Sequence, residues 1–232
     1  MLYLALLLGL IIGSFISAIT YRIPRDIGFV KGRSFCDNCK KELFWYDNIP
    51  LFSFLAYRGK SRCCDKKISI RYPIIELSSA IGAVLLFVLF PFSLFIINYS
   101  LFILSLVIFV IDLEHQIIPD ELTWLLLLLA FLLPSPFTLF PILFTGFFFA
   151  LLFLALHLIT KGRGMGLGDV KLAIPLSLIL GFEKSINWIL VTFVLGGIIA
   201  TILLLFKRAN LKTKIAFGPF MILAFWIIYF YK

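Results

Sequence analysis

Residues 164–172, with the sequence GMGLGDVKL, separate two apolar segments at 137–160 and 170–182. Asp169 is therefore an ionisable side chain at the head of an apolar segment, where a charge is costly and indicates a functional site. The glycines leave room beside it because they have no Cβ, and a helix that begins at Asp169 would favour the ionised carboxylate. An ordinary capping aspartate is the alternative interpretation. A second carboxylate, Asp112, at the end of another apolar segment favours a functional site.

The chain as a whole is unusually apolar. Of its 232 residues, 62% are hydrophobic and 14% are charged, whereas a soluble domain is nearer half apolar and a quarter charged. Segments of about 20 apolar residues span a bilayer. The expected fold is an all-α polytopic membrane protein with about eight transmembrane helices, at 1–20, 73–90, 93–111, 121–133, 137–160, 170–182, 187–206 and 215–231.

The formal net charge of +9 is concentrated in a few loops. Of the 21 Lys and Arg, 12 lie in residues 21–72, three in 161–171 and four in 207–214. Clustering of this kind in alternate loops indicates that these loops are cytoplasmic and face an anionic membrane surface. It does not indicate a nucleic-acid-binding protein. The first segment has no basic residue before it, so it is predicted to be a helix that stays in the membrane. On this topology Asp112 and Asp169 lie on the same, cytoplasmic face.

Residues 21–72 form a small cytoplasmic insert between the first helix, 1–20, and a transmembrane core, 73–232. About fifty residues are too few to form a large hydrophobic core, so an additional stabilising group such as a metal ion is expected. Four cysteines are available for it: Cys36, Cys39, Cys63 and Cys64.

The cysteine pattern resembles a structural zinc ribbon. A cytoplasmic location favours metal over a disulfide, although reduced cysteines without metal and a disulfide both remain open. The pattern is irregular because a regular second CxxC turn would have cysteine at position 61, where this chain has Ser61.

Asp112 and Asp169 have the chemistry of a catalytic pair. Two neighbouring carboxylates tend to share one proton, so the ionised member can activate water while the protonated one donates to a scissile carbonyl oxygen. We expect Asp169 to be the anion and Asp112 the acid, with Gly166 and Gly168 beside them. Glu114 and Glu121 lie in the stretch 112–121, the only acidic part of an otherwise basic cytoplasmic face.

Three other polar residues have simpler expected roles. Asp120 is expected to cap the helix that begins near Leu122, and Glu76 to pair with Arg71 or reach the membrane interface. His157 is expected to make a polar contact near the end of its segment.

Residues 164–172, together with Asp112 and the triplet at 118–120, resemble the type IV prepilin peptidases, which are membrane aspartic proteases with a GxGD motif. The resemblance extends over nearly the whole chain. It includes GSF at 13–15, RIP at 22–24, the cysteines at 36 and 39, WYDNIP at 45–50, RYP at 71–73, Glu76 and FGPF at 217–220.

The resemblance implies cleavage of the basic leader of prepilins or pseudopilins at the cytoplasmic face of a bacterial inner membrane, for a pilus or a secretion apparatus. It implies Asp112 and Asp169 as the catalytic residues, with no cofactor needed for proteolysis. Many relatives also N-methylate the new N-terminus with S-adenosylmethionine, an activity associated with the insert. The expected partners are prepilin-like substrates and the lipid bilayer, not nucleic acid.

Two alternatives from other classes stay open at this point. A secondary transporter could use Asp112 and Asp169 as proton or cation sites, although the two acids lie near the ends of their segments and the halves show no inverted repeat. The second alternative is a module built on residues 21–72 that binds a metal or nucleic acid.

Overall fold

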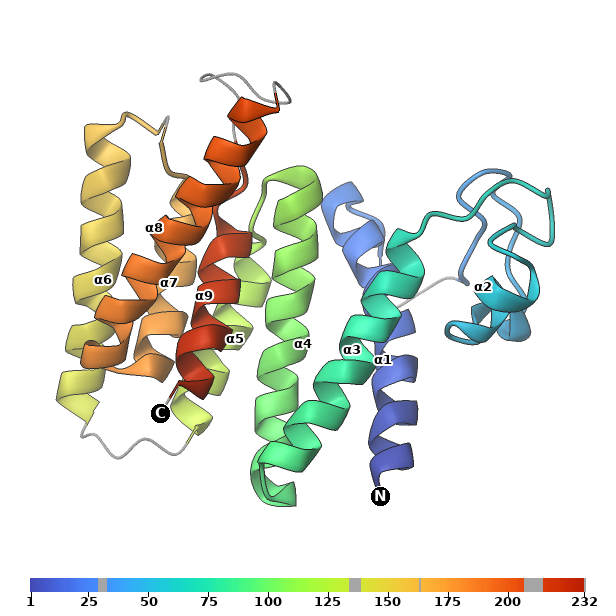
Figure 1. The fold of residues 1–232 in the computed structure, drawn as a ribbon, viewed down its shortest axis with the longest axis horizontal. Helices are drawn as coiled ribbons and strands as arrows, with labels where there is room; N and C mark the ends of the chain where they lie inside the picture. Colours follow the sequence, from blue (N-terminus) through green and yellow to red (C-terminus); the bar gives the residue numbers. More distant parts are fainter. Residues whose placement is uncertain (29–32, 134–138, 163, 207–214, 232) are drawn as a thin grey trace. The chain divides into compact units, whose positions relative to one another are not determined.

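The computed structural model of the chain describes residues 1–28, 33–133, 139–162, 164–206 and 215–231. The basic loop at 207–214 and the turn at 134–136 lie outside them. Within the described ranges the regular structure is helical, with two isolated β-bridges and no β-strand. The α-helices are α1 (Leu2–Arg22), α2 (Phe52–Ala56), α3 (Arg71–Leu89), α4 (Phe92–His115), α5 (Asp120–Leu132), α6 (Leu139–Ile159), α7 (Leu167–Leu180), α8 (Phe182–Leu205) and α9 (Gly218–Phe230), as Figure 1 shows.

Each of the eight expected apolar segments coincides with one helix, so the predicted fold class is confirmed. The largest difference is at α8, which begins at Phe182 instead of 187. The short helix α2, inside the insert, was not predicted from the sequence.

The membrane helices differ in length. Helices α1, α3, α4 and α8 are long and apolar enough to cross a membrane. Helices α5, α7 and α9 have 13, 14 and 13 residues. At 1.5 Å per residue they are each about 20 Å long, less than the roughly 30 Å of a hydrocarbon core. The chain is thus a multi-pass membrane protein in which some core helices fall short of a full span.

The described residues form two compact units, Met1–Val107 and Ile108–Lys232, and the boundary falls within α4. The predicted division into 1–20, 21–72 and 73–232 rests on topology and stays a prediction.

In the first unit, α1 packs closely along α3. Gly9 and Gly13 lie on the face of α1 that meets α3, and a Cβ on them would approach the Cα atoms of Ala80 and Glu76 to 2.6 and 2.7 Å. Two small residues four apart allow helix backbones to approach in this way, which is a common means of association in membranes. This contact fixes Glu76 against the first helix.

In the second unit, α7 is the most enclosed helix. It contacts α5, α6, α8 and α9, and nine of its 14 residues are buried, Asp169 among them. A buried hydrogen bond from the Trp188 indole N–H to the Met221 carbonyl, 2.8 Å long, joins α8 to α9. The glycine-rich stretch therefore leads into the centre of this unit.

Candidate active site, metal centre and cavity

Asp112 lies in the last turn of α4 and is 4% exposed. Its Oδ2 accepts a hydrogen bond of 3.0 Å from the backbone N–H of Gly218, the first residue of α9. A Cβ at Gly218 would lie 2.6 Å from the same oxygen. Only a residue without a side chain therefore lets the start of α9 approach this carboxylate so closely.

Asp169 is the third residue of α7, which begins at Leu167 rather than at Asp169 as expected. The side chain is 7% exposed, and its Oδ2 accepts the N–H of Gly166 at 2.9 Å. His157 makes the polar contact expected of it, since its Nδ1 lies 2.7 Å from the Met165 carbonyl oxygen. The glycine-rich turn is thus held from α6 on one side and by the aspartate on the other.

Ile118 joins the two halves of this site. A Cβ on Gly168 would be 3.0 Å from the Ile118 Cβ, and one on Gly218 would be 3.3 Å from its Cδ1. The Asp112 and Asp169 carboxylates are near enough for their charges to interact. The structure therefore brings the two predicted aspartates into one buried site, with both predicted glycines, Gly166 and Gly168, beside it.

Asp120 has a different position from the one expected. It is the first residue of α5, after Pro119 at the cap, so the prediction of a capping role is wrong. Its carboxylate pairs with the Lys171 ammonium at 2.7 Å, and both side chains are about half exposed. Glu114 and Glu121 are exposed at the surface, on either side of Asp120 in the sequence.

The insert brings together the four predicted cysteines. The Sγ atoms of Cys36, Cys39, Cys63 and Cys64 all lie within 4.8 Å of one another, with 3.8 Å between Cys36 and Cys64 and 3.0 Å between Cys39 and Cys63. Tetrahedral zinc at 2.3 Å from each sulfur would place sulfurs about 3.8 Å apart. The donor set therefore fits zinc.

The ionisation of these thiols also fits a cation. Burial acts to raise the pKa of Cys36, but hydrogen bonds from the Ser61 hydroxyl and from the N–H groups of Cys39 and Asn38 outweigh it and lower the pKa to about 6. The pKa of Cys63 is raised to about 12, chiefly because its thiol shares a hydrogen bond with Cys39. Metal ligation requires a deprotonated thiol, so a bound cation would favour the thiolate form of Cys63.

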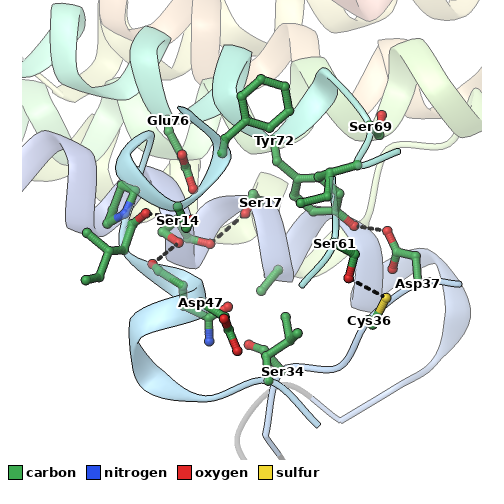
Figure 2. Close-up of a pocket in the computed structure, with 18 of the residues that line it drawn as sticks. Ser14, Ser17, Ser34, Cys36, Asp37, Asp47, Ser61, Ser69, Tyr72 and Glu76 are labelled. Carbon is green, nitrogen blue, oxygen red and sulfur yellow. Dashed lines mark hydrogen bonds between the residues drawn. The ribbon is translucent and has the colours of Figure 1, made fainter. Parts of the chain in front are cut away.

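A cavity of about 770 Å³ lies between α1, α3 and the insert, within the first unit. Figure 2 shows Glu76, Asp47, Asp37 and Tyr72 around it, with Cys36 and Ser61 of the cysteine cluster at its wall. Its volume is in the range of small-molecule sites. The cavity is not evident from the sequence, because its wall is assembled from three separate segments.

Glu76 is 8% exposed and lines this cavity. Its Oε2 accepts the N–H of Leu51 at 2.8 Å. The Arg71 guanidinium instead donates to the Thr20 hydroxyl at 2.7 Å. The expected pairing of Glu76 with Arg71 is therefore wrong, because the carboxylate is buried beneath the insert and bonds to its backbone. Its placement at the membrane interface stays a prediction.

Two parts of the sequence match known protein families. Residues 7–90 match the Bacterial Peptidase A24 N-terminal domain, and residues 99–201 match the Type IV leader peptidase family. No solved structure matches the chain.

Three curated relatives named prepilin leader peptidase/N-methyltransferase are similar along nearly their whole length. The protein from Stutzerimonas stutzeri is 32% identical over 96% of this chain and 88% of its own. The Pseudomonas aeruginosa protein is 31% identical over 96% and 87%, and the Vibrio cholerae protein 32% identical over 97% and 94%.

Proposed function

The chain belongs to the type IV leader peptidase family, and from this premise we propose that it cleaves the basic leader of prepilins or pseudopilins. The site would act at the cytoplasmic face of a bacterial inner membrane. The observation that carries the proposal is the pair of buried aspartates, Asp112 and Asp169, each tied by a backbone N–H to the start of a helix. The matches give no support to a secondary transporter.

The two aspartates would work as a general acid and a general base. The ionised carboxylate takes a proton from water as the water oxygen attacks the scissile carbonyl, and the protonated one donates its proton to the carbonyl oxygen. Asp169, in the first turn of α7, is the proposed base. Asp112, in the last turn of α4, is the proposed acid. Gly218 fixes one Asp112 oxygen and leaves the other for the proton.

The test compares leader cleavage of a purified prepilin by the wild type, Asp112→Asn and Asp169→Asn. Both variants should lose cleavage, because neither remaining carboxylate can supply acid and base together. Asp120→Asn is the matched control, since it removes one exposed ion pair worth about 0–1 kcal/mol, and it should cleave as the wild type does. Cleavage retained by either dyad variant would refute the assignment.

Glu114 and Glu121 are the proposed contacts for the basic leader. Both carboxylates are exposed and lie in the acidic stretch, where they would attract a cationic peptide. The double change to glutamine should raise KM at low salt with little change in kcat, and the difference should shrink as salt screens the charges. An unchanged KM at low salt would remove this role.

The cavity of the first unit is the proposed site for S-adenosylmethionine in a second activity, N-methylation of the new N-terminus. Its wall combines the buried carboxylate of Glu76 with aromatic rings, among them Tyr21, Trp45 and Tyr72. Rings and carboxylates suit a ligand that carries a sulfonium and an ammonium. When bound, that ligand supplies an electrophilic methyl group, and Glu76 would hold the positively charged part of the donor.

Glu76→Gln separates this activity from proteolysis. The amide oxygen can still accept the Leu51 N–H, so the fold should be kept while the charge is lost. We expect weaker S-adenosylmethionine binding by calorimetry and less methylated product by mass spectrometry, with leader cleavage unchanged. Normal donor affinity in this variant would contradict the proposed site.

A further inference from the structure

The insert contains the same backbone turn twice. The first begins at Cys36 and the second at Ser61, and their side chains meet across 25 residues of sequence. In each turn the first residue donates its N–H to the carbonyl five residues on, and the fifth residue donates back to the first. The paired bonds are Cys36 to Lys41 and Ser61 to Lys66, both 2.8 Å, and Lys40 to Cys36 and Asp65 to Ser61, 2.9 and 2.8 Å.

The two turns also agree in the backbone conformation of the fifth residue and in the β-bridge that closes each of them. The fifth residue has positive φ in both, 58° at Lys40 and 55° at Asp65. An antiparallel bridge closes each turn at equivalent positions, Phe35 with Glu42 and Lys60 with Lys67. The two turns are thus copies of one structure, and their residues can be paired by position.

The equivalence of the two turns shows which ligand position departs from a regular CxxC turn. Ser61 is equivalent to Cys36, Cys64 to Cys39, and Cys63 to Asn38. A regular pair of CxxC turns would supply sulfur from the first and fourth positions of each. Here the second turn has a hydroxyl at its first position and a thiol at its third, and that thiol still reaches the common cluster.

Ser61 stays inside the cluster. It is 5% exposed, and its Oγ lies 3.2 Å from the Cys36 Sγ and 3.1 Å from the Cys63 Sγ. These are hydrogen-bond distances to sulfur. A hydroxyl there can donate its one proton to either thiolate, and hydrogen bonds of this kind stabilise metal-bound sulfur.

We infer that Cys63 has taken over the zinc-ligand role of the first position in the second turn, and that Ser61 acts there as a hydrogen-bond donor to the thiolates. The inference rests on zinc binding by the four cysteines, which we propose from their fit to zinc, and on the repeated turn of this chain. It concerns the ligands of the metal. Its test therefore measures zinc binding and zinc coordination, and not the enzymatic activities.

The experiment measures zinc content and the number of sulfur neighbours of zinc by X-ray absorption, on the full-length protein purified with reductant. The wild type should bind one zinc with four sulfurs at about 2.3 Å. Cys63→Ser should show three sulfurs or lose the metal. The double variant Ser61→Cys with Cys63→Ser restores two regular turns and should return to four sulfurs, which also guards against a Cys63→Ser protein that fails to fold.

Ser61→Ala tests the hydrogen bond separately. It should keep four sulfurs but bind zinc about 10- to 100-fold more weakly in chelator competition, as is usual for groups that support metal ligands. A wild-type site with three sulfurs and one oxygen, a double variant that stays below four sulfurs, or unchanged affinity in Ser61→Ala would overturn the inference. Absence of zinc from the wild type would instead refute the zinc proposal on which it rests.

Discussion

Replacing Gly218 by alanine places a methyl group against the proposed catalytic acid. The new Cβ would lie 2.6 Å from the Asp112 Oδ2, whereas ordinary contact begins at 3.4 Å. The carboxylate must therefore withdraw by about 0.8 Å, and the 3.0 Å hydrogen bond from the Gly218 N–H would lengthen beyond bonding distance. The clash involves a short side chain in a buried site, so little room exists for a compensating shift.

The expected loss follows from that hydrogen bond. Asp112 gains negative charge as it gives up its proton, and a hydrogen bond to a charged group contributes about 1.5–3 kcal/mol. Each 1.36 kcal/mol of activation free energy is about tenfold in rate. Gly218→Ala should therefore lower kcat for leader cleavage roughly 10- to 150-fold. KM should change little, because the exposed acidic surface proposed to bind the leader is untouched.

The matched control is Gly197→Ala, in the middle of α8. A Cβ there would have no atom within 4 Å, so kcat should stay at the wild-type value, and stability should rise by no more than about 1 kcal/mol. Both variants are assayed in detergent with a purified prepilin, alongside their thermal unfolding. If Gly218→Ala unfolds like the wild type and cleaves within about twofold of its rate, the carboxylate does not depend on this contact.

The remaining predictions concern packing. Gly13→Leu should force α1 from α3, because even a Cβ would lie 2.7 Å from the Glu76 Cα; a clear fall in Tm is expected, while Ile11→Leu, at a position 62% exposed, should leave Tm unchanged. An unaltered Tm in Gly13→Leu would disprove close packing. Trp188→Phe should lower the unfolding free energy by about 1–3 kcal/mol, since it leaves the buried Met221 carbonyl without its 2.8 Å indole partner. Chemical denaturation measures this, and a smaller change would show that the carbonyl finds another donor.

The sequence by itself determined the helices and the types of residue at the sites. A backbone in hydrocarbon must satisfy its own hydrogen bonds, so long apolar segments become helices whatever their neighbours are. The residues that end one helix before the next begins, such as Gly181 before α8, also act through local backbone conformation. Asp112 and Asp169 could be identified because an ionisable group beside an apolar membrane segment costs free energy. The cysteines could be identified because so small an insert needs an additional stabilising group.

Only the tertiary structure decided which groups meet. Gly218 reaches Asp112 across 106 residues of sequence, and the Leu51 N–H reaches Glu76 across 25. Likewise, the spacing of the cysteines marks position 61 as irregular, but only the folded turns bring Cys63 into the cluster beside Ser61. Contacts of this kind depend on how closely particular backbones approach and on which polar groups burial leaves to be satisfied. Hydrophobicity along the chain carries no information about either.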